Sequence, residues 1–155
     1  TAAQEALRGA EAEAAQKREH LEAEYHAALS QYKKLQGEVN LLEENLEALG
    51  LVECSRVWAL ELPRGLEWLR GELAQADLVL ADPPYGGGPA REVLEALGRP
   101  GILQPGARLV LEHHAKDEVP ESSGRLVRVR ARRYGETMVS TYQVADASAA
   151  EERGR

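Results

Sequence analysis

A run of four residues combines groups that suit chemistry on a planar amine: Asp82, Pro83, Pro84 and Tyr85. They follow a short apolar run at 78–81, which predicts a strand buried on both faces. The two prolines remove backbone donors and fix φ, so the chain must leave the sheet rigidly here. Glycines at 86–88 then allow the backbone to approach a ligand closely. In open α/β sheets, ligands bind at such carboxyl ends of strands.

Methylation of an exocyclic amine suits this arrangement. Such an amine is a poor nucleophile because its lone pair is delocalised into the ring. The Asp82 carboxylate and the Pro83 carbonyl are placed to accept its two N–H bonds and to orient the nitrogen toward a methyl donor. Tyr85 offers a ring for stacking on the base. The same residues also suit a plain strand that ends in a proline turn with a solvent-facing Asp82, but the strand, motif and glycines together favour the functional interpretation.

Further segments surround this motif in a fixed order: ENLEALGL at 44–51, VWAL at 57–60, LVLEHH at 109–114 and RRYGETMVSTYQV at 132–144. Together with DPPY at 82–85, they resemble the C-terminal half of the RsmD family. Members of that family are S-adenosylmethionine-dependent methyltransferases that act on the guanine N2 amine of small-subunit rRNA. The resemblance extends over residues 39–144.

The resemblance implies a cofactor, a partner and a set of site residues. The implied cofactor is S-adenosylmethionine, contacted by Glu61 and Asp82. The implied partner is ribosomal RNA or the small ribosomal subunit, with the target base flipped out of its stack. The implied catalytic residues hold the amine and stack the base: Asp82, Pro83, Pro84 and Tyr85.

A dense basic stretch lies near the C-terminal end: Arg125, Arg128, Arg130, Arg132 and Arg133. Guanidinium groups suit phosphate oxygens, and Tyr134 adds a stacking surface. Arginines that alternate along an exposed edge strand also prevent aggregation between sheet edges, which is the alternative explanation. We interpret one subset as RNA contacts: Arg130, Arg132, Arg133 and Tyr134.

One part of the family pattern is missing from the 155 residues. The family carries a glycine-rich turn after its first strand and an acidic residue after its second, and neither is present. Because the family places these two strands between the third and fourth, three arrangements remain open. In the first, the strand predicted at 56–60 pairs directly beside the strand at 78–81. In the second, another chain supplies the missing strands. In the third, the chain is a fragment or a fusion joined near residue 39.

The N-terminal third has the spacing of a coiled coil. Seam residues recur every seven positions from 7 to 49, with alternate seam positions at 25, 32, 39 and 46: Leu7, Ala14, Leu21, Tyr25, Ala28, Tyr32, Leu35, Val39, Leu42, Leu46 and Leu49. Polar seam residues at 11 and 18 weaken the first turns. Such a helix must bury its seam on a partner helix or on the α/β domain, so a homo-oligomer through the helix and docking within the chain both remain open. Gly50 is expected to end the helix.

Composition sets further limits. A net charge of −7 argues against a protein that coats nucleic acid through bulk charge. The single cysteine, Cys54, excludes an internal disulfide framework, is expected to be buried and fits a cytoplasmic location. No apolar segment is long enough to cross a membrane, so no membrane association is expected. Glu112, His113 and His114 resemble a ligand cluster, but adjacent histidines on a strand point to opposite faces, so no metal is expected.

These patterns predict an α/β fold: a partial Rossmann-like methyltransferase sheet with a C-terminal hairpin, preceded by a long helix. The expected parts are a long helix at 1–38, an α/β domain at 39–145 and a flexible tail at 146–155. Within the domain, strands are predicted at 56–60, 78–81, 108–112, 126–131 and 137–144, and helices at 63–74 and 89–97.

The predicted function is methyl transfer from S-adenosylmethionine to guanine N2 in small-subunit rRNA. The alternative is a non-catalytic coiled-coil oligomerisation protein that carries a degenerate methyltransferase domain. The DPPY run at 82–85 favours the first, and the missing glycine-rich turn favours the second.

Overall fold

The computed structural model describes residues 2–86 and 88–145, so the predicted tail at 146–155 lies outside the described residues. The described residues fall into two compact units, which divide between residues 59 and 60. The predicted α/β class with a long N-terminal helix is confirmed. No helix in the described part of the chain is both long and apolar enough to cross a membrane.

The first unit contains one long helix, α1 (Ala2–Ala48). Its end is set by Gly50, which has φ +69°. The N–H of Gly50 donates to the Glu47 carbonyl, and the N–H of Leu51 donates to the Leu46 carbonyl. This pair of bonds is a Schellman motif, which favours glycine because a Cβ is strained at positive φ. The predicted end of the helix is therefore confirmed.

The segment after α1 differs from the prediction. A short 3₁₀ helix, η1 (Val52–Cys54), forms there, and residues 55–60 form no strand although all of them are described. A four-residue apolar run has no period that separates a strand from an extended loop, so the strand predicted at 56–60 is wrong. The rewired sheet that needs this strand is wrong for the same reason. Cys54 is exposed rather than buried.

The second unit is built on a five-stranded sheet with the order β1-β2-β5-β4-β3. The strands are β1 (Leu78–Ala81), β2 (Arg108–His114), β3 (Ser122–Ser123), β4 (Leu126–Tyr134) and β5 (Thr137–Val144). β1 and β2 are parallel, and all other neighbours are antiparallel. β4 and β5 form the predicted C-terminal hairpin.

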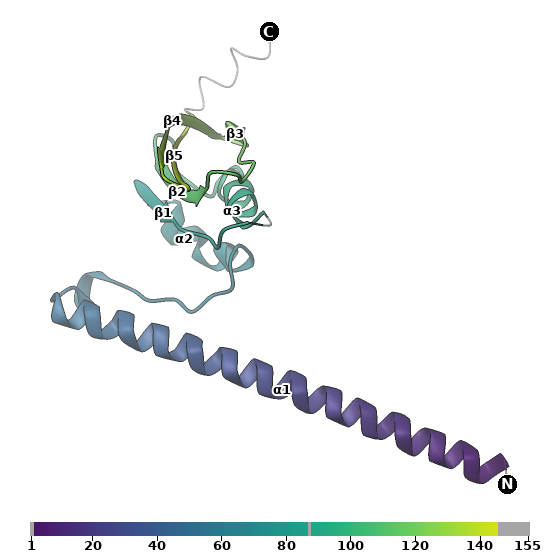
Figure 1. The fold of residues 1–155 in the computed structure, drawn as a ribbon. Coiled ribbons are helices and arrows are strands. Elements are labelled where there is room, and N and C mark those ends of the chain that lie inside the picture. The colour runs from purple at the N-terminus through teal and green to yellow at the C-terminus, as the bar shows by residue number, and fades with distance from the viewer. Residues whose placement is uncertain (1, 87, 146–155) are drawn as a thin grey trace. The chain divides into compact units, whose positions relative to one another are not determined.

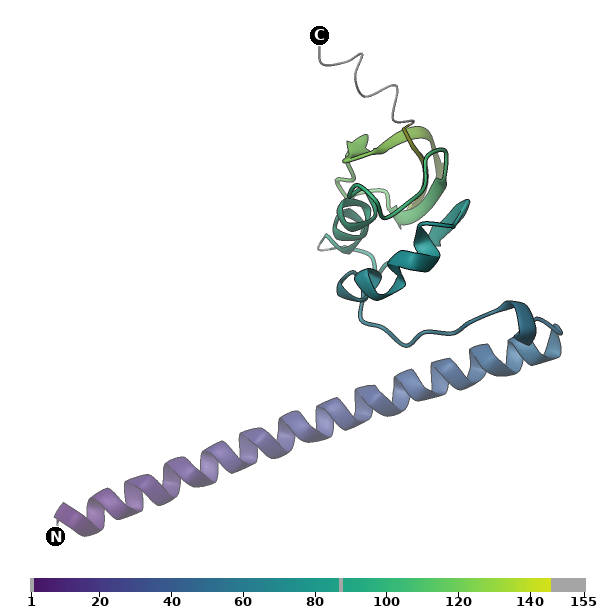
Figure 2. The same cartoon turned by 180° about the vertical axis from the view of Figure 1, so that it is seen from behind.

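One helix supplies much of the core. The sheet curls around α3 (Pro89–Leu97), as both views of the ribbon show (Figures 1 and 2). Pro89 stands in the first turn, where its missing N–H costs nothing. Apolar side chains of α3 and the sheet bury one another: Val93, Leu94, Leu97, Leu109, Leu111, Leu126, Tyr142 and Val144. This face of the sheet is called the core face below.

The helix predicted at 63–74 forms only in part. A 3₁₀ helix, η2 (Arg64–Leu69), is followed by the four-residue helix α2 (Arg70–Leu73). Gly65 and Gly71 each disfavour an α-helix by about 1 kcal/mol relative to alanine, which apolar spacing alone does not reveal. A side chain at Gly65 would also collide with Leu60.

β1 is an edge strand of the sheet. Val79 and Ala81 pack against the core, whereas Leu78 and Leu80 are 54% and 73% exposed. The prediction that this strand is buried on both faces is wrong, because Leu78 and Leu80 point to the face opposite the core and stay exposed there.

A β-bulge at Val129 reverses the alternation of β4. Arg128 lies opposite Tyr142, but Arg130 lies opposite Thr141. Opposed residues of antiparallel strands point to the same side, so Arg128 is on the core face with Tyr142 and Arg130 is on the other face. A regular alternation along 126–131 would put Arg128 and Arg130 on one face, and the extra residue of the bulge separates them because it shifts the two-residue period.

We call the side opposite the core the open face, because its residues are exposed or half-buried. From β1 to β4 the register places on it Leu78, Leu80, Val110, Glu112, His114, Thr137, Val139, Thr141, Arg130, Arg132 and Tyr134.

A close backbone contact joins α3 to the start of β4. The carbonyl of Gly98 accepts the N–H of Arg125 at 2.9 Å, and a Cβ on Gly98 would collide with the carbonyl of Ser123. We expect Gly98→Ala to lower the free energy of unfolding by about 1–3 kcal/mol, as overpacking does. Gly71→Ala is the matched control, because a Cβ there meets nothing within 4 Å. Urea unfolding measures both, and equal stability of the two variants would contradict the close approach.

Candidate active site

The chain leaves β1 at Asp82 and turns at once toward α3. Pro83 and Pro84 cannot donate to a ladder, so the strand ends at Ala81. Gly86 and Gly88 have φ values of +78° and +104°, which a residue with a Cβ rarely adopts. The sequence thus forms a rigid turn that places Asp82 and Tyr85 at the carboxyl end of β1.

A cavity of about 430 Å³ lies beside β1 and contains the start of this turn. β1, α3 and the segment around η2 contribute its walls: Leu62, Pro63, Leu66, Val79, Leu80, Ala81, Asp82, Pro83, Pro84, Pro89, Glu92, Val93 and Leu97. The volume is in the range of small-molecule sites, about 300–1,000 Å³. Apart from the carboxylates of Asp82 and Glu92, the lining side chains are apolar, so the cavity suits a largely apolar ligand with positive charge.

Two acceptors in this cavity are unpartnered. Within residues 2–86 and 88–145, no hydrogen-bond donor or cation pairs with the carboxylate of Asp82 or the carbonyl of Pro83. Asp82 is exposed and Pro83 is half-buried. Adjacent free acceptors of this kind are what an amine with two N–H bonds requires.

Tyr85 turns away from the cavity toward the open face. Its hydroxyl donates to Glu112 Oε1 at 2.7 Å, and it accepts from the Thr137 hydroxyl at 2.8 Å. The ring of His114 makes an edge contact with the Tyr85 ring, with centroids 5.7 Å apart. Although these contacts hold the ring, the residue is 48% exposed. Tyr85 is therefore an anchored ring with surface left for stacking.

Opposing effects act on the pKa of the Tyr85 phenol. The hydrogen bond with Thr137 lowers this pKa, whereas the hydrogen bond to Glu112, loss of solvent and the charges of Glu112 and Asp82 raise it. The net result is a pKa above the ordinary value. The phenol consequently keeps its proton at neutral pH and remains a donor to Glu112.

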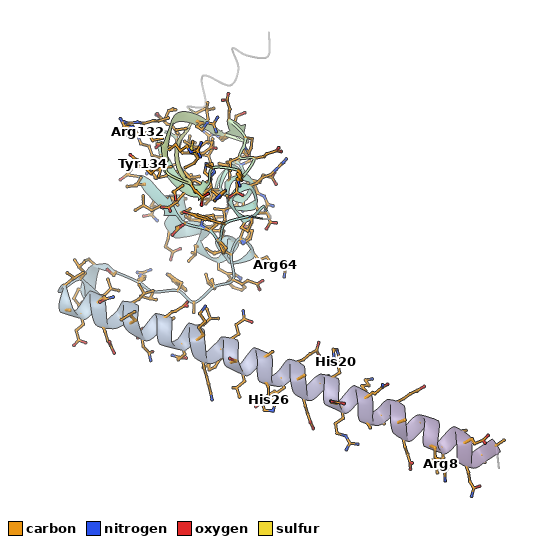
Figure 3. The ribbon with its side chains drawn as sticks, viewed as in Figure 1. Arg8, His20, His26, Arg64, Arg132 and Tyr134 are labelled. Carbon is orange, nitrogen blue, oxygen red and sulfur yellow. The ribbon has the colours of Figure 1, made fainter. Side chains whose placement is uncertain are left out.

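Three of the four predicted RNA contacts share the open face. Arg130, Arg132 and Tyr134 are exposed, and Arg132 and Tyr134 project from the same side of the domain (Figure 3). Neither Arg130 nor Arg132 has an ion-pair or hydrogen-bond partner among the described residues. Arg133 lies on the other face, where its Nε donates to the Gly135 carbonyl at 2.7 Å.

Glu61 lies just outside this site. Leu62 and Pro63, the next two residues, line the cavity, but Glu61 itself does not. Its carbonyl accepts the N–H of Gly65, and its side chain is exposed.

The two histidines of β2 point to opposite faces, as predicted. His113 is buried, with Nδ1 3.0 Å from the His114 carbonyl and Nε2 3.0 Å from the Ser140 hydroxyl. A carbonyl only accepts, so Nδ1 donates. His114 lies on the open face beside Tyr85. Within the described residues, no three His, Cys, Asp or Glu side chains are grouped so that they could hold a metal ion.

Sequence reasoning missed the two hydrogen-bond partners of Tyr85, Glu112 and Thr137, and the second carboxylate of the cavity lining, Glu92. Glu112 stands at the end of β2, and parallel neighbours bring their carboxyl ends together, so the β1–β2 pairing would have pointed to it. Thr137 is paired with His114 at the start of β5, and no local signal marks that pairing.

Comparison with known proteins supports the architecture. Residues 27–143 match the model of the family described as "Conserved hypothetical protein 95", so the match begins before residue 39, inside α1. None of the curated proteins matches the sequence.

Three solved structures are similar to the chain. A "conserved hypothetical protein" of Streptococcus pyogenes superposes with a TM-score of 0.59 at 22% identity, covering 69% of this chain and 64% of that one. The "Putative methyltransferase yhhF" of Escherichia coli gives 0.52 and 22%, with 69% and 56% covered. A "putative methylase" of Haemophilus influenzae gives 0.51 and 23%, with 70% and 66% covered. The chain thus spans less than two thirds of each of these proteins, and they share its fold.

The anchoring of Tyr85 makes a prediction about pH. Because its pKa is raised in the fold, the neutral phenol contributes stability that is present below its ordinary pKa of 10.0 and is lost as pH rises through the raised value. We expect Glu112→Gln to lower the pKa of Tyr85, because it removes a negative charge. Ultraviolet titration of wild type and Glu112→Gln, each against its Tyr85→Phe counterpart, isolates this phenol. An unchanged pKa in Glu112→Gln would contradict the anchoring hydrogen bond.

Proposed function

The chain belongs to the family described as Conserved hypothetical protein 95, the RsmD family, and on that premise we propose that it serves methyl transfer to RNA. The proposed donor is S-adenosylmethionine, and the proposed acceptor is the N2 amine of a guanine in small-subunit rRNA. The observation that carries this proposal is that the Asp82 carboxylate and the Pro83 carbonyl, at the carboxyl end of β1, have no hydrogen-bond donor among residues 2–86 and 88–145.

In the proposed reaction, Asp82 and Pro83 orient the acceptor amine. The carboxylate of Asp82 accepts one N–H and the carbonyl of Pro83 accepts the other, which draws the nitrogen lone pair out of conjugation with the base. S-adenosylmethionine supplies an electrophilic methyl group when bound. The new nitrogen–carbon bond forms as the sulfur–carbon bond breaks, and the nitrogen then loses a proton through Asp82 to water. Pro84 keeps the turn rigid.

The chemistry of the cavity fits the proposed donor. Its apolar walls suit an adenine ring, and the carboxylates of Asp82 and Glu92 suit the positive charges of the sulfonium and ammonium groups. Glu61 precedes the lining residues Leu62 and Pro63, and it would contact the donor only at the rim. The 155 residues contain no glycine-rich turn after a first strand, so the family's usual contacts to the donor are incomplete here.

The open face is the proposed RNA surface. The ring of Tyr85 is anchored beside the end of β2. Tyr134 lies directly opposite Thr137, whose hydroxyl is hydrogen-bonded to Tyr85. Arg130 and Arg132 follow along the same face. In the proposal, a flipped guanine stacks on Tyr85 while these guanidinium groups bind flanking phosphates. Arg133 lies on the other face, and in the proposal its Nη atoms donate hydrogen bonds to a phosphate as well.

A second candidate function is a non-catalytic oligomerisation protein with a degenerate methyltransferase domain. It is favoured by α1, whose described residues include no buried side chain, and by the missing glycine-rich turn. It requires neither Asp82 nor the open face, so single substitutions separate the two functions.

Substitution of Asp82 tests the proposed reaction. We expect calorimetry to detect S-adenosylmethionine binding to the full chain, weakened about tenfold by Asp82→Ala because a carboxylate beside the donor is removed. In a methylation assay on small-subunit RNA, we expect Asp82→Asn to lower turnover by about 10²–10³, since the transition state lacks a hydrogen bond to the amine. Glu118→Gln, an exposed carboxylate outside the cavity lining, is the control. Absence of binding at millimolar donor would support the second function.

Substitution of the open-face arginines tests RNA contact. The double variant Arg130→Gln/Arg132→Gln should reduce the slope of log K against log salt by about 0.7–0.9 for each phosphate that is no longer neutralised. Arg91→Gln is the matched control, because Arg91 pairs with Glu95 on α3 at 2.8 Å. Fluorescence anisotropy with a labelled rRNA fragment measures the slopes. If the double variant and the control have equal slopes, the open face is not the RNA surface.

A further inference from the structure

The seam of α1 is exposed along most of the helix. Leu35 is 49% exposed, Leu21 is 53% exposed, and Tyr25 and Tyr32 are each 63% exposed. None of the described residues of α1 is buried. At about 1.5 Å per residue, the 47 residues of α1 span about 70 Å. The apolar stripe along this length stays in water unless a partner covers it.

We propose that the occupant of this seam is a second copy of α1 in antiparallel orientation, centred between His26 and Ala27. Each heptad has two seam positions, and in this register a residue at one of them faces a residue at the other one on the partner helix. Four distinct layers are then apolar: Leu7 with the partner's Leu46, Ala14 with the partner's Val39, Leu21 with the partner's Tyr32, and Tyr25 with the partner's Ala28.

The seam residues favour antiparallel over parallel pairing. In a parallel pair in register, identical seam residues meet, so Glu11 would face the partner's Glu11 and Arg18 the partner's Arg18. Two layers would then bury like charges. In the antiparallel register Glu11 faces the partner's Leu42 and Arg18 faces the partner's Leu35. Long side chains such as these can extend their charges past a leucine to the solvent.

The residues that flank the seam agree with this orientation. In the antiparallel register Lys17 lies beside the partner's Glu38, and Arg8 lies beside the partner's Glu43. Each attraction occurs twice by symmetry, and no flanking pair brings like charges together. In the parallel register, Lys17 meets the partner's Glu22, but Glu38 meets the partner's Glu43 and repels it.

One substitution distinguishes the two orientations, because Glu38→Lys has opposite effects on them. In the antiparallel pair it replaces the anion beside the partner's Lys17 with a cation and should weaken association about tenfold at low salt. In the parallel pair it relieves the repulsion from the partner's Glu43 and should strengthen association. The double variant Lys17→Glu/Glu38→Lys restores the antiparallel attraction.

Two controls complete the design. Glu19→Lys makes the same charge change on the outer side of the helix and should leave association unchanged. Glu38 also lies 3.8 Å from Lys34 within the helix. The double variant still lacks that ion pair, so its recovery would show that the weakening by Glu38→Lys arises between copies.

Light scattering and sedimentation equilibrium of the full chain measure the outcome. The expected result is a dimer weakened by Glu38→Lys, recovered in the double variant and unaffected by Glu19→Lys. A monomer at all concentrations would overturn the proposal. Tighter association of Glu38→Lys, or a change no larger than that of Glu19→Lys, would overturn the antiparallel register. These results are independent of methyl transfer.

Discussion

The parallel pairing of β1 with β2 is the contact on which the candidate site depends. It aligns Ala81, the last residue of β1, with Leu111, so Asp82 leaves the sheet beside Glu112, which still lies within β2. Asp82 and Glu112 thereby come to the same edge of the sheet, and Tyr85 can reach Glu112 at 2.7 Å. Without this register the DPPY turn at 82–85 would be a rigid loop with nothing to hold its ring.

The site has two sides with different physical character. On one side, Asp82 and Pro83 line a largely apolar cavity, and their acceptor oxygens have no donor among the described residues. On the other side, the ring of Tyr85 lies on the open face, where Arg130 and Arg132 of β4 have no ion-pair partner among the described residues. The turn between the strand and α3 joins the two sides, which is why two prolines and two glycines at positive φ are concentrated in it.

Two sets of apolar side chains stay exposed in the described part of the chain. Leu78 and Leu80 of β1 and the seam of α1 are far more exposed than core leucines. At β1 the exposure follows from the register, which directs Leu78 and Leu80 to the open face, away from the core. At α1 the exposure follows from a helix whose apolar stripe requires a partner.

The sequence by itself determined the elements whose signals are local. The heptad spacing and Gly50 set α1 and its end, Pro89 and Gly98 bounded α3, and the family motifs identified the α/β class and the DPPY turn. The tertiary structure alone decided what depends on pairing. It left residues 55–60 without a strand, placed β1 at an edge, and put Arg130 on the face opposite Arg128 through a bulge. Its strand pairings also brought Glu112 and Thr137 to Tyr85. Such contacts join residues far apart in the chain, and no local pattern encodes which strands become neighbours.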